Sequence, residues 1–411
     1  MSLIIYAIPL FLSLMVLEML AARLLRAPVV RFHDAVTSIH IGFVSELFRS
    51  VTKLVSVVVY ATLVQQVASF EWDPRHPAVW IVAFFLYDFF YYWAHRCGHE
   101  INLLWASHVV HHSSEDFNLS TAMRQSWTNQ VFYWIFYLPM AIVGIPVEVF
   151  VVTALASAVY QFWVHTRLIR RMGWMDRVFV TPSNHRVHHG RNAYCIDRNY
   201  GGTLILWDRL FGTYAAERDQ EPVVFGTLTP LRSWSPVWAN FKNYLVIASE
   251  AAALKGWRAR LHLVFAPPGA VSRSVIAPPP LDAAPYETPV TGLQKIYGTF
   301  ALLGLMACVL DLLLASPALD MRLRLGLTVA MALATVPLAW VFEGRRGALG
   351  LEAVRCILML GPLAVGTWYH PVVPLMQAAA GIGLVVSLVL LTALARRPAA
   401  ALPHTAAGVT P

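Results

Sequence analysis

Histidines crowd one stretch of this chain, and their spacing constrains how it can fold. Nine of the fifteen histidines lie between residues 95 and 189. They form one H-x-x-x-H pair, two H-x-x-H-H motifs and one isolated histidine: His95 and His99; His108, His111 and His112; His185, His188 and His189; and His165. Residues three or four apart share one face of a helix, so we expect each motif to point its imidazoles at one place. The segments that carry them must then fold around a shared centre.

The number of histidines favours a centre with two metal ions. Imidazole binds zinc, copper, iron and nickel, but a four-coordinate zinc site needs only four ligands. The four cysteines form no C-x-x-C pair, so we expect neither a thiolate site nor a disulfide framework. An all-histidine donor set favours iron, because open positions on iron bind O₂. Histidines scattered over a surface or core would not repeat this spacing.

Long apolar runs place the chain in a membrane. Hydrophobic residues make up 57% of it and charged residues only 13%, against about 25% charged residues in soluble domains. We expect an all-α integral membrane protein with about nine spans. The runs are 3–25, 40–70, 77–93, 127–145, 147–165, 296–315, 325–342, 348–367 and 372–395. Arginines gather at the ends of these runs, which indicates topology and no nucleic-acid partner.

The same arginines predict the side of the membrane. Arg23, Arg26 and Arg31 follow the first run, which puts its end in the cytoplasm. Counting runs from there places both His95 and His165 on the cytoplasmic side. Arginine follows His165 at once, in agreement. Alanine-, arginine- and proline-rich ends suggest a bacterial inner membrane, with an ER-type membrane as the eukaryotic alternative.

The runs and the histidines together divide the chain into five parts. We expect N-terminal transmembrane helices at 1–75, a catalytic core at 76–225, a cytoplasmic segment and linker at 226–290, C-terminal transmembrane helices at 291–397 and a tail at 398–411. The C-terminal runs show no ionisable cluster in the sequence, so we assign them no chemistry. Residues 267–289 are rich in proline and alanine and predict an exposed linker.

Two acidic residues near the first histidines are candidates for supporting roles. Asp88 lies seven residues, or two helical turns, before His95, so both share a face. A carboxylate inside the membrane is costly and usually functional. Asp88 would accept a ring N–H from a ligand histidine; a structural cap, or a pair with Arg96, is the alternative. Glu100 follows His99 and could act as a base or as a neighbour of the metal.

These features favour an oxygen-dependent enzyme that acts on a lipid C–H bond at the membrane surface. A metallohydrolase is a rival, but the H-E-x-x-H motif is absent, since no histidine follows His99-Glu100 at the required place. A histidine-lined metal transporter is a second rival. It would place ligands at the bilayer midplane between internal repeats, and the sequence displays neither.

The motifs HRCGH, HVVHH and HRVHH, preceded by DFFYYWA, resemble those of the fatty acid hydroxylase/sterol desaturase superfamily over about residues 80–215. HHSSEDFNLSTAMRQS, YQFWVHT, NHRVHHGRNAYCIDRNYGG and LWDRLFGTY are similar to the branch of that superfamily that oxidises glyceryl ethers. The resemblance implies that the nine histidines are the metal boxes and that Glu100 is the acidic residue beside the first box. Some members carry a further histidine where this chain has Ile169.

What the resemblance implies about activity is more specific than the residues alone. It implies two iron ions, O₂ and tetrahydrobiopterin, and hydroxylation of the ether-linked carbon of an alkylglycerol to give fatty aldehyde and glycerol. Fatty acid, sterol or carotenoid hydroxylation or desaturation is the alternative within the same superfamily. The expected partners are a lipid substrate, the membrane and an electron donor that the sequence does not name, without nucleic acid.

Overall fold

A computed structural model describes residues 7–270, 277–315, 319–359 and 373–395. Within these ranges every regular element is a helix, and only two isolated bridges occur, Phe179 with Leu204 and Gly190 with Phe225. The all-helical prediction is therefore confirmed for the described residues. The helices of the N-terminal part and core are α1 (Ile8–Leu24), α2 (Phe32–Val67), α3 (Pro77–Glu100), α4 (Asn102–His112), α5 (Leu119–Ala122), α6 (Asn129–Phe132), η2 (Tyr133–Tyr137), α7 (Leu138–Val143), α8 (Val147–Trp163), α9 (Met175–Val178), α10 (Pro182–His188) and α11 (Leu206–Leu210).

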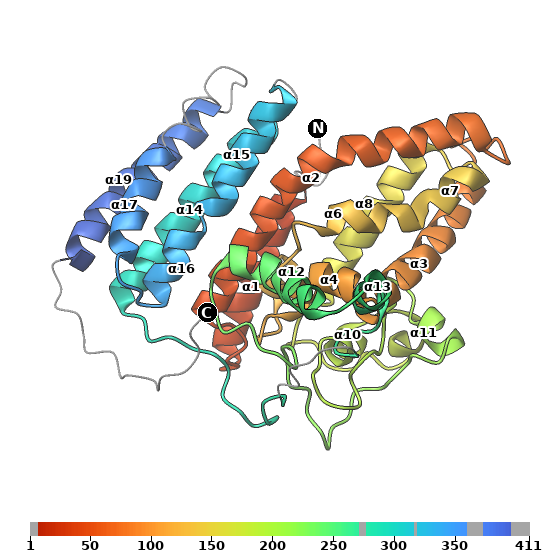
Figure 1. Cartoon of the computed structure of the whole chain (residues 1–411), viewed down its shortest axis with the longest axis horizontal. Helices are drawn as coiled ribbons and strands as arrows, with labels where there is room; N and C mark the ends of the chain where they lie inside the picture. The colour runs from red at the N-terminus through yellow and green to blue at the C-terminus, as the bar shows by residue number, and fades with distance from the viewer. Residues whose placement is uncertain (1–6, 271–276, 316–318, 360–372, 396–411) are drawn as a thin grey trace.

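The remaining helices are α12 (Pro236–Ala253), α13 (Trp257–Phe265), α14 (Gly292–Ala315), α15 (Met321–Leu333), α16 (Val336–Phe342), α17 (Ala348–Leu358) and α19 (Val373–Ala395). In Figure 1, α14 to α19 stand together on one side of α1 and α2, whereas α3, α4, α7 and α8 lie on the other side. The segments that carry α10 and α11 lie at the lower end of α3 in this view.

Among the described residues, four helical stretches are long and apolar enough to cross a membrane: 32–67, 77–100, 292–314 and 321–342. The chain is therefore a membrane protein, but the expected nine spans are not confirmed. The run 127–145 is broken into α6, η2 and α7, and α8 has 17 residues, fewer than the roughly 20 that a perpendicular span needs. The starts of the first and ninth runs, the end of the eighth and the tail lie outside the described residues.

The C-terminal helices share a large apolar core with α2. Ile41 and Val44 of α2 pack with Leu305 and Val309 of α14, and all four are buried. Between helices that cross a membrane, such packing stabilises through van der Waals contact, because lipid tails are as apolar as these side chains. The C-terminal helices are therefore part of the same packed body as the N-terminal helices.

A buried ion pair lies in the C-terminal helices and corrects the expectation that they hold no ionisable cluster. Arg355 donates from Nε to Glu352 at 2.9 Å, and Tyr297 donates to the same carboxylate. All three side chains are buried. The sequence pattern missed the cluster because its members lie on two different helices, which only the tertiary fold brings together.

Residues 277–291 are mostly exposed, as a linker should be, but they are anchored to the core. Arg191 donates to the carbonyl oxygens of Pro279 and Pro280 at 2.6 and 2.7 Å. Arg31 donates to the carbonyl of Tyr286 at 2.8 Å. This segment therefore covers one face of the histidine-bearing part of the chain.

Candidate metal centre

The nine histidines come together from helix ends and the segments beside them. His95 and His99 lie in the last two turns of α3, and α4 begins two residues after α3 ends. His165 lies two residues after the end of α8. His185 and His188 lie on α10, and His189 directly follows it. All nine side chains are buried. The convergence expected from the spacing is confirmed.

The histidines form two groups, each of which could hold a metal ion. Group A contains His95, His99, His108, His112 and His188, and group B contains His111, His165, His185 and His189. Within each group, the candidate ligand nitrogens lie within 4.8 Å of one another. No thiolate or carboxylate belongs to either group among the described residues.

This division corrects one expectation from the sequence, because each H-x-x-H-H motif serves both groups. His108 and His112, four residues apart, point into group A, whereas His111 points into group B. In the second motif, His185 and His189 belong to group B and His188 to group A. Neighbouring positions on a helix diverge by about 100°, so the middle histidine of each motif faces a different direction.

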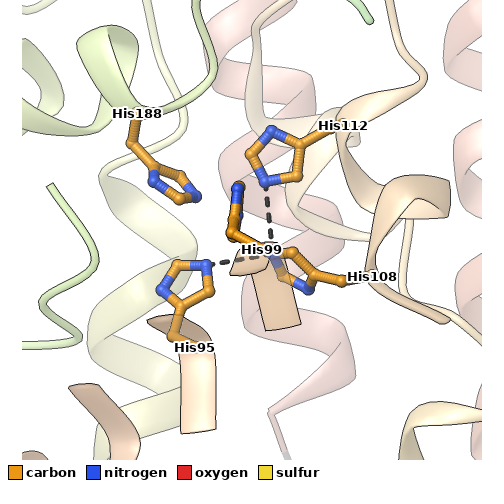
Figure 2. A group of neighbouring side chains, drawn as sticks. All are labelled: His95, His99, His108, His112 and His188. Atoms are coloured by element: carbon orange, nitrogen blue, oxygen red, sulfur yellow. Dashed lines mark hydrogen bonds between the residues drawn. The ribbon is translucent and has the colours of Figure 1, made fainter. Parts of the chain in front are cut away.

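Group A converges through its Nε2 atoms (Figure 2). The Nε2 atom of His108 lies 3.0 Å from that of His95 and 3.2 Å from that of His112. The Nε2 atoms of His99 and His188 are buried without a hydrogen-bond partner in the described part of the chain. Two nitrogens bound to one ion at about 2.1 Å and at right angles are about 3 Å apart, so this spacing suits shared ligation.

Group B shows the same spacing. The Nε2 atom of His165 lies 3.1 Å from that of His111 and 2.9 Å from that of His185. The Nε2 atoms of His185 and His189 are 3.2 Å apart. The rings of His112 and His189 stack at 4.3 Å between centroids, so the two groups are in direct contact.

Backbone carbonyls fix the tautomer of four of these rings. The Nδ1 atoms of His95, His111, His165 and His188 lie 2.8, 3.2, 2.8 and 2.9 Å from the carbonyl oxygens of Tyr200, Arg124, Gln161 and Arg198, respectively. A carbonyl can only accept, so each Nδ1 must carry the proton and each neutral ring presents a lone pair at Nε2.

The lone pairs provide a test of whether a cation fits. His111 and His165 both present Nε2 lone pairs, and these two atoms are only 3.1 Å apart. Two lone pairs at that distance repel, because neither neutral ring has a proton to place between them. A cation at this position removes the repulsion, so the donor set of group B fits a metal ion.

Burial keeps these rings neutral. The pKa of His111 and that of His188 lie well below the ordinary value, first because burial penalises the charged ring and second because neighbouring histidines repel a further charge. The pKa values of His185 and His189 are lowered by the same causes. Neutral imidazole is the form that binds metal, so the site is prepared for ligation at neutral pH.

Asp88 is buried beside the site, but its partners differ from those expected. Its carboxylate accepts from the backbone N–H groups of Thr203 and Leu204 at 2.7 and 3.0 Å and from Nε1 of Trp207 at 2.9 Å. In the described part of the chain it forms no hydrogen bond with a histidine ring, and the alternative pair with Arg96 is not formed either. Asp88 therefore anchors the loop whose Tyr200 carbonyl orients His95.

Glu100 lies at the edge of the site. Arg96 donates from Nε to its carboxylate at 2.9 Å, and the Glu100 side chain is 40% exposed. Glu100 follows His99 of group A in the sequence, but its carboxylate does not belong to the cluster of ligand atoms. Ile169, where related chains carry a further histidine, is 39% exposed and belongs to neither group.

Several buried polar residues near the histidines escaped the sequence reasoning. Asp208 accepts from the backbone N–H groups of Tyr200 and Gly201 at 2.7 and 2.8 Å, and burial raises its pKa to about 6. The fully buried Arg124 side chain donates to Ser38 at 3.1 Å and lies 3.5 Å from Asp34. Both lie in motifs singled out above, Asp208 in LWDRLFGTY and Arg124 in HHSSEDFNLSTAMRQS. Their partners, backbone N–H groups for Asp208 and side chains of α2 for Arg124, have no sequence signal.

A cavity of about 390 Å³ reaches both groups. His95 and His108 of group A and His111, His165 and His185 of group B line it. The rest of its wall has an apolar part and a polar part. Phe150, Val151 and Leu155 of α8 supply apolar surface, and Glu46, Arg49 and Lys53 of α2 supply polar surface. A cavity of this kind suits a molecule with an alkyl chain and a polar head.

Comparisons with known proteins agree with this geometry. The profile of the family "Fatty acid hydroxylase" matches residues 80–213, which include all nine histidines. An alkylglycerol monooxygenase from Homo sapiens is 36% identical over 389 residues, which cover 91% of this chain and 85% of the relative. Its counterpart from Xenopus tropicalis is 37% identical over 365 residues, or 85% and 79% of the two chains.

A more distant relative matches a smaller share of the chain. An ornithine lipid hydroxylase from Rhizobium tropici is 29% identical over 160 residues, which cover 38% of this chain and 48% of the relative. No solved structure matches. The relatives are monooxygenases and hydroxylases, which favours an oxidoreductase over the hydrolase and transporter alternatives. Its two histidine groups, its apolar helices and its similarity to these relatives together show that the chain belongs to the fatty acid hydroxylase family, on its alkylglycerol monooxygenase branch.

Proposed function

We propose that the protein is a di-iron monooxygenase that hydroxylates the ether-linked carbon of alkylglycerols. The observation that carries the proposal is the pair of buried histidine groups whose Nε2 atoms converge. Similarity to alkylglycerol monooxygenases over most of the chain selects the ether carbon as the point of attack. One oxygen atom of O₂ enters the C–H bond and the other leaves as water, and the hemiacetal then divides into fatty aldehyde and glycerol.

The nine histidines would hold the metal, with groups A and B taking one iron each. Bound iron supplies the activation of O₂ at open positions. The protein's part is to hold the rings, because each Nδ1–H that a carbonyl accepts fixes both tautomer and orientation. Asp88 would support the site without binding the metal, because it anchors the segment at Thr203 and Leu204. Glu100, paired with Arg96, would contribute charge at the rim of group A.

The 390 Å³ cavity would position the lipid. An alkyl chain against Phe150, Val151 and Leu155 would leave the glycerol end near Glu46, Arg49 and Lys53, with the ether carbon between them and beside the histidines. Charged side chains on a membrane helix are costly unless they face a cavity or a partner. The apolar wall would exclude water while the C–H bond is attacked.

The remaining assignments concern the setting of the enzyme. We place the histidine groups at the cytoplasmic side of a bacterial inner membrane, or of an ER-type membrane in a eukaryote, because arginines follow His165. We keep residues 76–225 as the catalytic core between the N-terminal and C-terminal helices. An electron donor is required, and tetrahydrobiopterin is the donor that the family resemblance favours.

Purified protein offered different lipids tests this function. We expect about two iron ions per chain, O₂ consumption, and fatty aldehyde released from an alkylglycerol. A chain-matched acylglycerol, which has an ester in place of the ether, should release no aldehyde. Zinc without O₂ consumption would contradict the oxygenase. A hydroxylated or desaturated fatty acid, sterol or carotenoid, with the ether lipid left intact, would overturn the choice of substrate.

A further inference from the structure

Two helices outside the candidate spans, α12 and α13, pack on the histidine-bearing helix α4. Ile247 of α12 and Leu263 of α13 are buried in one cluster with Ala106 of α4. At the start of α4, the side chain of Asn102 donates to the carbonyl oxygen of Leu263 at 3.1 Å. The two helices, residues 236–265, are called the α12–α13 segment below. This segment is thus fixed to one of the helices that carry the proposed metal ligands.

The helix α12 has apolar side chains on the face turned away from α4 as well. Trp238, Phe241 and Leu245 follow one another at intervals of three and four residues, and they are 41, 40 and 56% exposed. On a regular helix, Trp238 and Leu245 lie about 180° and about 160° around the axis from the buried Ile247. These three side chains therefore form an exposed apolar stripe opposite the packed face.

The helix α13 repeats this arrangement. Trp257, Leu261 and Phe265 follow one another at intervals of four residues, and they are 66, 47 and 59% exposed. Leu261 and Phe265 each lie about 160° around the axis from the buried Leu263. Six large apolar side chains are thus exposed on one short segment. Exposed apolar surface that gathers in this way marks a site of interaction with a protein or a membrane.

The α12–α13 segment adjoins the spanning helices without being one of them. The two helices have 18 and nine residues, and neither belongs to the candidate spans of the described ranges. However, α12 contacts α2, α15 and α16, all of which supply candidate spans. In Figure 1, α12 lies across the direction of α14, α15 and α19 and not along it. Its apolar stripe therefore continues the lipid-facing surface of the spans in the plane of the membrane.

The charged residues of the segment match an anionic lipid surface. Its sequence contains four lysines and arginines but only one acidic residue, Glu250. Lys255, Arg258 and Arg260 lie where the two helices join, and all three are exposed. Helices that combine an apolar face with basic residues lie in the boundary between headgroups and acyl chains, where tryptophan also gathers. Lysine and arginine add attraction to anionic headgroups.

We propose that the α12–α13 segment is an interfacial membrane-binding element. Its apolar stripes enter the leaflet on the side where the histidine groups lie, and Lys255, Arg258 and Arg260 bind anionic phospholipid headgroups. A second copy of the chain fits this surface less well, because a two-fold contact brings the same patch of both copies together and would place like charges opposite one another. The inference rests on the membrane spans and not on the proposed reaction.

The position of this segment has a consequence for the cavity that reaches the histidines. Asn240 of α12 accepts from the backbone N–H of Trp127 at 2.9 Å, and the hydroxyls of Tyr244 and Thr128 are 2.7 Å apart. Gln130, two residues further along, lines the cavity. The interfacial segment therefore holds this part of the cavity wall near the level of the headgroups, where a lipid can enter without leaving the membrane.

Fluorescent labels on introduced cysteines test the assignment in the iron-loaded, full-length protein in lipid nanodiscs. Phe241→Cys and Leu261→Cys place a bimane label on each stripe. Asp219→Cys is the matched control, because the Asp219 side chain is 78% exposed and lies outside the segment. The unaltered protein, labelled in parallel, gives the background from its own four cysteines. Quenching is measured with lipids that carry a nitroxide near the headgroup or near the chain end, and with iodide in the water.

Lipid composition and charge reversal test the role of the basic side chains. Nanodiscs of phosphatidylcholine are compared with nanodiscs that also contain phosphatidylglycerol. The double change Arg258→Glu/Arg260→Glu is added to Leu261→Cys. Its matched control is Arg75→Glu in the same background, because Arg75 is exposed and lies outside the segment.

We expect the nitroxide near the headgroup to quench both stripe labels at least about twofold more than the one near the chain end. Iodide should quench the Asp219→Cys label more than either stripe label. The double charge reversal should lower shallow quenching at least about twofold when phosphatidylglycerol is present, whereas Arg75→Glu should leave it unchanged. Iron content and helical circular dichroism should match those of the unaltered protein, because the substituted side chains point away from α4.

Four results would overturn the assignment. Equal iodide quenching of the stripe and control labels would mean that the stripes face water. Stronger quenching by the nitroxide near the chain end would place the segment in the acyl core. Cross-linking of Leu261→Cys between two chains, with its label shielded from both lipid and iodide, would assign the surface to a second copy. Unchanged quenching after the double charge reversal would contradict the binding of anionic headgroups.

Discussion

Groups A and B use the same ligand chemistry, but different parts of the chain hold them in place. In group A, carbonyls of the loop that follows α10 orient His95 and His188, and Asp88 and Asp208 anchor that loop. Group B is oriented by the carbonyl of Arg124, whose side chain pairs with Asp34 of α2. Glu18 of α1 also holds this part in place. Its carboxylate accepts hydrogen bonds from the backbone of Leu119 and from the hydroxyl of Thr166, which follows His165.

The difference teaches that the N-terminal helices do more than anchor the chain. Glu18 and Asp34 are buried carboxylates on α1 and α2, and both reach segments that carry group B histidines. The loop around Tyr200 does the same for group A. A change in one support should therefore disturb one metal position and spare the other, which makes the comparison testable.

Removing a ligand should produce the largest effect. His188→Ala takes a nitrogen from group A, and His111→Ala takes one from group B. We expect each variant to remain folded, to lose iron first from its own group, and to lose turnover by more than about 100-fold, the upper range for loss of an outer-shell partner alone. Iron content, helical circular dichroism and aldehyde release measure this. Near-normal turnover in either variant would contradict the shared di-metal site.

Arg124→Met should have the next largest effect and should act on group B. It removes the nearer of the two cations beside the buried carboxylate of Asp34, since Arg31 lies 3.8 Å from the same group. Breaking a buried pair completely costs about 3–5 kcal/mol, and we expect a smaller loss here because Arg31 remains. We expect a lower unfolding temperature and preferential loss of one iron ion. The double variant Arg124→Met/Asp34→Asn is the control, since it removes both charges and should recover part of the stability. No recovery would mean that the pair is not the cause.

Asp88→Asn should have a smaller effect and should act on group A. Asparagine keeps one acceptor oxygen for the three donors at Thr203, Leu204 and Trp207, so the loop loosens without leaving a charge unpaired. We expect iron affinity to fall by about tenfold in group A, the lower range for an outer partner of a ligand. Iron titration of metal-free protein measures it. Equal weakening of both groups would contradict separate supports.

Glu100→Gln should have the smallest effect of the series. The Glu100 carboxylate is paired with Arg96 and partly exposed, and such pairs contribute roughly 0–1 kcal/mol. We therefore expect stability and iron content close to those of the unaltered protein. Turnover is the sharper readout. A loss of turnover comparable with that of His188→Ala, at unchanged iron content, would show that Glu100 takes part in catalysis.

Much of the site could be predicted from the sequence because side-chain spacing on a helix is a local property. Eight of the nine histidines were singled out by their i, i+3 and i+4 intervals and His165 by its place between the motifs, and all nine come together. Their division into two groups was not predicted, because it depends on where α3, α4 and α10 meet in space. Asp88 was correctly chosen as a buried carboxylate, but its partners at Thr203 and Leu204 are backbone groups more than a hundred residues away.

The membrane architecture shows the same limit. Apolar composition predicts helices in a membrane, and α2, α3, α14 and the α15–α16 pair meet the length that a span needs. The run at 127–145 has suitable composition, but its helix is broken at η2. The pair of Glu352 and Arg355 shows the converse, since residues three apart in an apolar run form a buried cluster only once Tyr297 of another helix packs against them.

The sequence by itself determined the chemistry of this protein: an apolar helical chain, a donor set made of imidazole alone, and the positions that supply it. Those properties follow from residue type and helical period, which act over a few residues. The tertiary structure alone decided which histidines share a centre, which carbonyls orient them and where the cavity beside them lies. Those features depend on contacts between distant segments, for which local spacing carries no information.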